Sequence, residues 1–232
     1  MALPRLRQVA FAATDLDAVA GQLRSALRLA EPYADEGVGV FGLRNAVFAV
    51  GDCFLEVVSP FRPDTAAGRY LERRGHDSGY MAMVQVADAE AARTRLQELG
   101  VRIVWDFAEA DIVDLHLHPR DVPGTLLALD QADPVGSWRW GGPGWTESVP
   151  EHPPGGLREL VIAVADPTAA ADRWARVIGV PAADGTLRLG DAIVRFAPAD
   201  GPDGIVALTL AVPHPELDGF EVAGVRIDLI AA

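Results

Sequence analysis

The feature that most constrains the fold of this chain is an internal repeat. An alternating apolar segment over residues 7–14 stops at an Asp and leads into an Ala-rich amphipathic segment, and the same order returns over 158–168 and, more weakly, over 80–88. One residue in each copy lies seven positions before the Asp, and these residues are Gln8, Met81 and Glu159. Copies of one supersecondary unit bury their apolar faces against one another. The fold is therefore expected to consist of several similar units.

The first repeat, over residues 4–75, shows what this unit is. The spacing of its apolar residues predicts a strand over 6–14 and a helix over 15–29, with Asp15 as the N-cap. Three short strands are then expected near 37–42, 45–50 and 53–59. The second repeat, over 79–131, has the same βαβββ order. We therefore predict an α+β fold of tandem βαβββ units that form cupped mixed sheets.

The second half of the chain predicts a reduced copy of the first half. A third repeat begins at Leu157, and a fourth starts with a strand over 205–212, after which Pro213-His214-Pro215 takes the place of a helix. The expected organisation has three parts: a complete domain over 1–131, a linker over 132–156 and a shortened domain over 157–232. The linker contains Trp138, Trp140 and Trp145. Exposing all three rings would be costly, so we expect the linker to pack against the domains.

Composition and charge narrow the range of partners. The chain has 232 residues and a formal net charge of −13, which disfavours binding to nucleic acid or to an anionic membrane surface. No apolar run reaches the roughly 18 residues of a membrane-spanning helix. The N-terminal residues lack the apolar stretch of a secretory signal, so a cytoplasmic location is expected. The single cysteine, Cys53, has no partner for an internal disulfide.

Three stretches carry a resemblance to a known superfamily. They read QVAFAATDL over 8–16, VGDCFLEVVSP over 50–60, and HLHPRD with GTLLAL within 116–129. In order and spacing they resemble the vicinal oxygen chelate (VOC) superfamily, in its glyoxalase-like and methylmalonyl-CoA epimerase-like branch. The resemblance covers residues 6–131 well and implies paired βαβββ units around a metal-centred pocket.

The resemblance also identifies the positions at which the superfamily holds its metal. These are the first and last strands of each unit, and they fall on Gln8, Glu56, Met81 and Ala128. Ala128 has no donor atom, and the Met81 thioether is a soft ligand suited to copper(I). We therefore expect no tight metal site and no cofactor. A weak divalent metal held by Gln8, Glu56 and substrate oxygens stays open as an alternative.

Two further features bear on catalysis. The epimerase branch carries a carboxylate base before its second strand, and the resemblance places this base on Asp35, with Glu36 as the neighbouring alternative. His116 and His118 alternate along one predicted strand, so both side chains project to the same face. A shared metal is one interpretation of the two histidines, and a strand end at His118-Pro119 is the favoured one.

Three functions remain open on these grounds. An apolar cup with few polar groups is typical of a ligand pocket, so the first is metal-independent binding of a small organic molecule. The second is a lyase or isomerase that acts on a carbonyl or CoA-linked substrate, with Glu56 or Asp35 as general base. The third is a scaffold whose cup is filled by its own side chains. A homodimer is compatible with each. The predicted pocket residues are Gln8, Phe11, Phe54, Glu56, Met81, Met83, His116 and Ala128.

The centre of this pocket is expected at Glu56. Strand alternation puts Phe54, Glu56 and Val58 on one face, and a carboxylate among such neighbours needs a partner. Gln8, on the adjoining first strand, is the expected hydrogen-bond donor. We therefore predict that Glu56→Gln folds but alters ligand binding.

Overall fold

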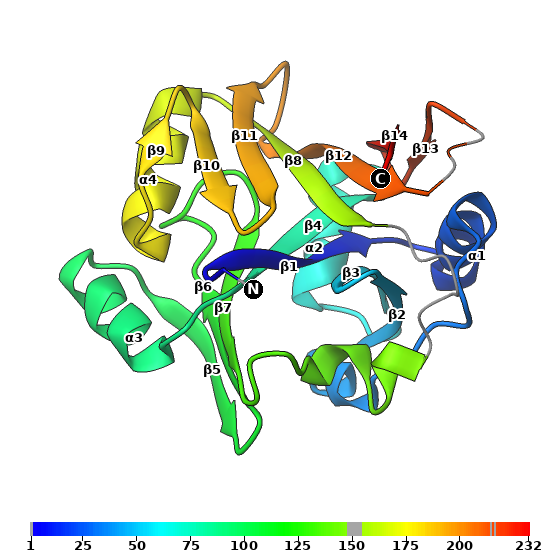
Figure 1. Cartoon of the computed structure of the whole chain (residues 1–232), viewed down its shortest axis with the longest axis horizontal. Coiled ribbons are helices and arrows are strands. Elements are labelled where there is room, and N and C mark those ends of the chain that lie inside the picture. The colour runs from blue at the N-terminus through cyan, green and yellow to red at the C-terminus, as the bar shows by residue number, and fades with distance from the viewer. Residues whose placement is uncertain (1, 148–154, 214, 216) are drawn as a thin grey trace. The chain divides into compact units, whose positions relative to one another are not determined.

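The computed structural model describes residues 2–147, 155–213, 215 and 217–232 (Figure 1). Its strands form two seven-stranded mixed sheets. The strands of the first sheet are β1 (Arg5–Ala12), β2 (Leu43–Val50), β3 (Cys53–Pro60), β4 (Ser78–Gln85), β5 (Ile103–Glu109), β6 (Ile112–Leu117) and β7 (Leu126–Ala132). Those of the second are β8 (Gly156–Val164), β9 (Ala182–Ala183), β10 (Thr186–Leu189), β11 (Ala192–Pro198), β12 (Gly204–Val212), β13 (Gly219–Val222) and β14 (Val225–Ala231). The sheets confirm the α+β fold of tandem βαβββ-like units.

Helices connect the strands, and α1, α3 and α4 start where the repeats predict. The α-helices are α1 (Leu16–Leu27), α2 (Ala66–Arg74), α3 (Ala89–Glu98) and α4 (Pro167–Ile178), and the 3₁₀-helices are η1 (Glu36–Phe41), η2 (Arg139–Gly141) and η3 (Trp145–Glu147). The Asp that ends each repeated strand caps the following helix, because its side chain accepts a backbone N–H three residues on. These caps are Asp15, Asp88 and Asp166. None of the described helices is both long and apolar enough to cross a bilayer.

The chain folds into two compact units, each assembled from separate segments. Compact unit 1 contains the chain up to residue 7, 81–139 and 158–205, and compact unit 2 contains 8–80, 140–157 and 206–232, apart from the undescribed residues. The predicted division into a domain over 1–131, a linker over 132–156 and a shortened domain over 157–232 stays a prediction. Residues 148–154 of the predicted linker, together with residues 214 and 216, lie outside the described residues.

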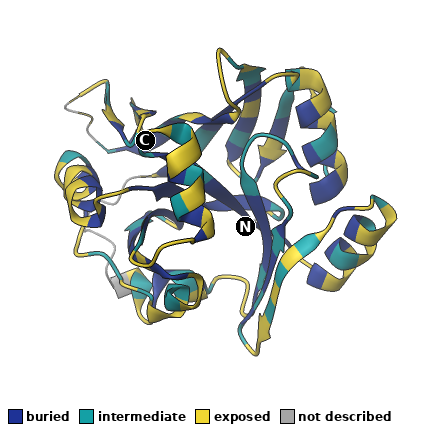
Figure 2. Ribbon diagram, turned by 180° about the vertical axis from the view of Figure 1, so that it is seen from behind, coloured by how far each residue is buried: buried dark blue, intermediate teal, exposed yellow. Residues whose placement is uncertain are grey.

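Compact unit 2 holds the strands β2, β3 and most of β1. β1 runs parallel to β3, with Gln8 opposite Phe54 and Ala10 opposite Glu56, while β2 pairs antiparallel with β3 and places Val47 opposite Glu56. Helix α1 buries its apolar stripe, which consists of Leu16, Val19, Ala20, Leu23 and Leu27. Burial is concentrated on the strands and on the inward faces of the helices (Figure 2).

One predicted strand of this unit is wrong. The predicted strand over 37–42 is replaced by η1 (Glu36–Phe41), because the Asp35 carboxylate accepts the Gly37 N–H at 2.8 Å and starts a turn. Gly42 ends this helix at φ +74°, a conformation that favours glycine. The connection after β3 contains α2, which the repeat does not predict, with Thr65 as its N-cap.

Compact unit 1 holds β5, β6, β7, β9, β10 and β11, together with most of β4 and of β8. The β4–β7 pairing is parallel, with Met83 opposite Ala128, and the β8–β11 pairing repeats it. Helices α3 and α4 are joined by Arg95, which donates to the Val177 and Ile178 carbonyls at the end of α4, at 2.8 and 2.9 Å. The two-residue strand β9 was not predicted, since it is too short to show a period.

Candidate functional site

A buried carboxylate with two amide donors lies at the centre of the β2–β3–β1 surface in compact unit 2. Gln8 Nε2 donates to Glu56 Oε2 at 2.9 Å, and Asn45 Nδ2 donates to Glu56 Oε1 at 2.7 Å. The three residues are between 0% and 6% exposed. The predicted Gln8–Glu56 hydrogen bond is therefore present. Each carboxylate oxygen has an amide partner, and these donors stabilise the charged form of Glu56.

The register decides which predicted residues share this face. Gln8 and Ala10 on β1 lie opposite Phe54 and Glu56 on β3, so their side chains project together. Phe11 lies opposite Val57 and therefore projects to the other face of the strand. The predicted placement of Phe11 beside Gln8 does not hold, because the two positions differ by three residues and a strand alternates with a period of two.

Asn45 is a site residue that the sequence analysis missed. It lies on β2 in the inward row with Leu43, Val47 and Ala49, where a polar residue among apolar ones could have been noticed. Its Oδ1 accepts the backbone N–H of Asp35 at 2.8 Å. Asp35 is thereby linked to Glu56 through one side chain, while the Asp35 carboxylate itself accepts the Gly37 N–H.

A chain segment covers one end of this face. The Trp145 ring meets the Phe54 ring edge-on at a centroid distance of 5.1 Å. A Cβ added at Gly141 would lie 2.4 Å from the Phe54 ring, and one at Gly142 would lie 2.5 Å from the Tyr33 ring, so the backbone passes directly over both. We call residues 140–147 the cover segment. Glycine is required at these two positions because any side chain would collide with an aromatic ring.

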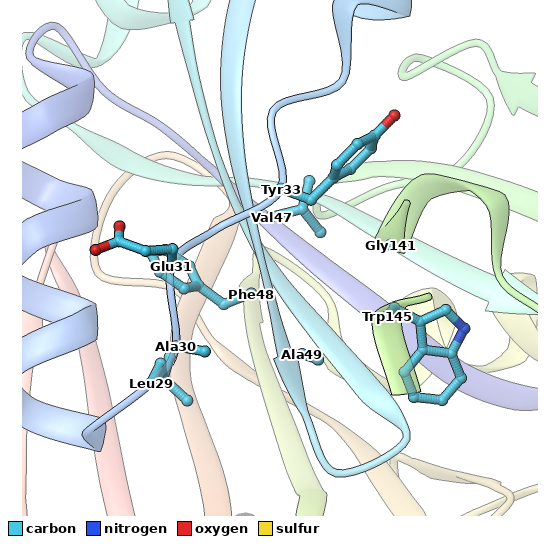
Figure 3. Close-up of a pocket in the computed structure, with 9 residues that line it drawn as sticks. All are labelled: Leu29, Ala30, Glu31, Tyr33, Val47, Phe48, Ala49, Gly141 and Trp145. Carbon is cyan, nitrogen blue, oxygen red and sulfur yellow. The ribbon is translucent and has the colours of Figure 1, made fainter. Parts of the chain in front are cut away.

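A small pocket remains beside the cover segment. It lies between the loop that carries Leu29 and Glu31, the strand that carries Val47, and the segment that carries Gly141 and Trp145 (Figure 3). Its volume is about 20 Å³. That is room for about one water molecule, whereas ligand pockets usually measure about 300–1,000 Å³. A ligand of ordinary size therefore needs the cover segment to move.

Helix α2 covers the other end of the face. Ala67 and Leu71 of α2 pack with Ala12 and Val58, and Tyr80 packs against the same cluster. Burial raises the pKa of Tyr80 to about 12, and the Tyr70 phenol and the Glu56 carboxylate raise it as well, while Arg69 and Arg73 lower it. Tyr80 is therefore an uncharged hydroxyl within the electrostatic range of Glu56.

The raised pKa of Tyr80 predicts an alkaline transition. An unfolded tyrosine ionises near pH 10, so the folded state favours the neutral phenol. The stability that this group contributes is complete below about pH 10 and is lost as the pH rises from about 10 to about 12. A spectrophotometric titration of the wild type and Tyr80→Phe isolates this phenol. Glu56→Gln should lower the Tyr80 pKa, and ionisation of Tyr80 at an ordinary pKa in the wild type would contradict its burial beside Glu56.

The remaining predicted pocket residues lie in compact unit 1. Met83 and His116 both lie opposite Ala128, and Met81 is two residues from Met83, so the four share one face. His116 Nε2 lies 2.9 Å from Asp114 Oδ2. The role of these residues as a ligand pocket stays a prediction.

The absence of a tight metal stays a prediction, and the donor atoms at the four expected positions support it. Of the four expected positions, Glu56 already accepts two amide N–H groups, Gln8 uses its amide to donate to it, Met81 offers only a thioether and Ala128 has no donor. Within residues 2–147, 155–213, 215 and 217–232, no group of three or more His, Cys, Asp and Glu side chains could hold a metal ion.

This chain matches a family model and a known epimerase. A family model described as a glyoxalase-like domain matches residues 9–178. The ethylmalonyl-CoA/methylmalonyl-CoA epimerase of Cereibacter sphaeroides is 31% identical over 132 residues, which are 55% of this chain and 97% of that protein.

Solved structures resemble this fold as well. A variant of Streptomyces coelicolor methylmalonyl-CoA epimerase in complex with 2-nitronate-propionyl-CoA has a TM-score of 0.52 at 24% identity, over 59% of this chain and 100% of that chain. A hypothetical protein from Staphylococcus aureus has a TM-score of 0.74 at 11% identity, over 99% of this chain and 100% of that chain. At these identities the likeness shows the fold alone. Because the family model covers more than half of its length, the chain belongs to the glyoxalase-like domain family of the VOC superfamily.

Proposed function

We propose that the protein binds a small organic molecule, without a metal, on the face that carries Gln8, Phe54 and Glu56. The observation that carries this proposal is the buried hydrogen-bonded triad of Gln8, Asn45 and Glu56. A charged group inside an apolar face costs free energy unless its partners are complete, and an apolar residue would serve a purely structural core at least as well. An apolar surface with a few oriented polar groups is the usual composition of a ligand site.

The ligand reaches this face by displacing the cover segment. The contacts of this segment with the face include that of Trp145 on the Phe54 ring and those of glycine backbone on the Phe54 and Tyr33 rings. These contacts are non-directional, and a ligand with an apolar or aromatic body replaces them. The ligand body then rests on Phe54 and Val47, and a hydrogen-bond donor of the ligand meets a Glu56 lone pair. If the cover segment never leaves the face, the protein is instead a scaffold whose cup is filled by its own side chains.

A ligand screen by thermal unfolding tests the proposal. The panel contains short-chain acyl-CoA thioesters, their free carboxylic acids and aromatic amides, each applied to the wild type, Glu56→Gln and the control Glu72→Gln, whose side chain is exposed on α2. A ligand at 100 times its dissociation constant adds about 2.7 kcal/mol of apparent stability. We expect at least one compound to stabilise the wild type and the control, and to stabilise Glu56→Gln less. No response from any compound would favour the scaffold, and an equal response of Glu56→Gln would remove Glu56 from the site.

An isomerase is the second candidate, and the 31% identity to an epimerase favours it. Proton transfer requires a base, and Glu56 is a poor one because both of its oxygens accept amide hydrogen bonds. Asp35 is partly exposed and is the better candidate. Methylmalonyl-CoA, one of the acyl-CoA thioesters of the panel, is incubated with the protein in D₂O. NMR then detects exchange of the hydrogen on the carbon next to the thioester for deuterium. Exchange that disappears in Asp35→Asn would support the isomerase over simple binding.

A further inference from the structure

A second polar pair, on β8 and β11 of compact unit 1, occupies the same register positions as Gln8 and Glu56 (Figure 1). On β3, Glu56 lies two residues beyond the partner of Gln8 in the parallel β1–β3 pairing. On β11, Arg195 lies two residues beyond the partner of Glu159 in the parallel β8–β11 pairing. Here too the side chains are joined, since Arg195 Nε donates to Glu159 Oε1 at 2.7 Å. The second pair therefore has a cation where the first has a carboxylate.

Arg188 adds a second cation to this surface. On β10, which pairs antiparallel with β11, Arg188 lies opposite Ile193, and Thr186 lies opposite Arg195. The two arginines are therefore diagonal neighbours on one face of the sheet, and at about 7–8 Å such neighbours are within reach of long side chains. The four residues form a square with guanidinium groups at two opposite corners.

This square lies on the face of the strands that is turned away from α4. The Trp174 ring of α4 meets the Phe196 ring of β11 edge-on at a centroid distance of 5.4 Å. Because side chains alternate along a strand, Arg195 projects to the opposite face. The Arg195 side chain is 45% exposed and that of Glu159 is 29% exposed, and Arg188 is exposed as well. Both guanidinium groups are therefore accessible from solvent.

The two guanidinium groups keep hydrogen-bond donors for a ligand. Glu159 uses the Nε of Arg195, which holds this side chain and leaves its two Nη groups, an edge that matches a carboxylate. Among the described residues, none pairs with the guanidinium of Arg188. Two arginines and one glutamate also make this surface locally positive in a chain of formal net charge −13. Such a surface attracts anions.

From this arrangement we infer a second binding site, which takes a small carboxylic acid with an apolar body. The carboxylate lies between Arg188 and Arg195 and accepts hydrogen bonds from both. The apolar body rests on Ile193, which is half-buried at a third corner of the square. Glu159 is a positioning residue, because it holds the Arg195 guanidinium. Inorganic phosphate would meet the same cations but would leave Ile193 uncovered, so a carboxylic acid is the better match. The site shares no residue with the Glu56 face.

Three probes separate the parts of this inference. Isovalerate has the carboxylate and the apolar body, isovaleramide has only the body, and inorganic phosphate has only the charge. Each is titrated at low ionic strength into isotope-labelled protein, and the readout is the NMR shift of the backbone amides of residues 186–195. We expect isovalerate to give a saturable shift there and to bind about tenfold more tightly than either of the other two, since a charge-assisted hydrogen bond and a short apolar contact each contribute on this scale.

Variants locate the binding at the two arginines. Arg188→Gln should weaken isovalerate binding about tenfold. Arg195→Lys keeps the charge but lacks the planar fork of the guanidinium, so it should weaken binding by a smaller factor. Arg176→Gln, at an exposed position of α4, makes the same change in net charge and is the control. It should leave isovalerate binding unchanged.

Four results would overturn the inference. They are an unshifted 186–195 segment on addition of isovalerate, isovaleramide binding as tight as that of isovalerate, phosphate binding as tight as that of isovalerate, and an Arg188→Gln effect no larger than that of Arg176→Gln. The last result would mean that net charge alone attracts the acid. Should Arg195→Lys fail to fold, Arg188→Gln and the three probes on the wild type still decide.

Discussion

Replacing Glu56 with leucine should lower the free energy of unfolding by about 3 kcal/mol. The substitution removes the acceptor of two buried amides, Gln8 Nε2 and Asn45 Nδ2, and each unsatisfied buried donor costs roughly 1–3 kcal/mol. Additional apolar surface from the leucine offsets roughly 1–2 kcal/mol of this cost. Urea denaturation, with the change taken from the midpoint at constant slope, measures the difference.

Two matched variants identify the cause of the Glu56 effect. Glu56→Gln keeps an oxygen acceptor and nearly the same volume, and an amide flip of Gln8 or Asn45 restores a second hydrogen bond, so we expect a loss of about 1 kcal/mol or less. Glu72→Leu, exposed on α2, should change stability by about 0.5 kcal/mol at most. A Glu56→Leu protein as stable as the wild type would mean that Glu56 does not hold these two amides together.

Removing the Trp138 ring should cost about 3–5 kcal/mol in compact unit 1. Trp138 is 1% exposed and its ring lies 5.5 Å from the guanidinium carbon of Arg7, which is itself fully buried. Arg7 Nη2 also donates to the Gly136 carbonyl at 3.3 Å, and Gln85 donates to the Val135 carbonyl at 2.7 Å. Trp138→Ala therefore leaves a large cavity beside a buried cation, and both effects destabilise the fold.

The Trp138 measurement is again urea denaturation, with Trp138→Phe as the matched variant. Phenylalanine keeps a π-face for Arg7 and fills part of the volume, so its loss should be clearly smaller than that of alanine. If alanine cost no more than phenylalanine, the ring at 138 would not be packed against Arg7, and residues 135–138 would not be held by the buried residues beneath them.

Features that depend on short-range pattern were predictable from the sequence. The Asp residues at 15, 88 and 166 end a strand and cap a helix, so one local rule located three helix starts. The Gln8–Glu56 hydrogen bond followed from strand alternation and from the position of the first strand next to the last strand of its unit. The caps rest on a local pattern of the chain, and the hydrogen bond rests on alternation together with the strand arrangement that the VOC resemblance implies.

Features that do not show in the hydrophobic period were not predictable. The 3₁₀-helix η1 replaces a strand because one carboxylate captures a nearby N–H, an interaction that hydrophobic periodicity does not record. The fit of Gly141 over Phe54 joins residues 87 positions apart, and nothing in a glycine- and proline-rich stretch indicates which ring it will cover. Phe11 illustrates a different error, because alternation alone already separates it from Gln8.

The central claim is that the ligand site of this chain works without the metal of its superfamily, and one measurement tests it directly. A compound that stabilises the wild type in the thermal screen is titrated by calorimetry into protein dialysed against a chelator, and then into the same protein with Mg²⁺, Mn²⁺ or Co²⁺ added back. The account predicts the same dissociation constant in every titration, and weaker binding to Glu56→Gln. Ligand binding that disappears on chelation and returns with one of these ions, in equal stoichiometry with the protein, would contradict it.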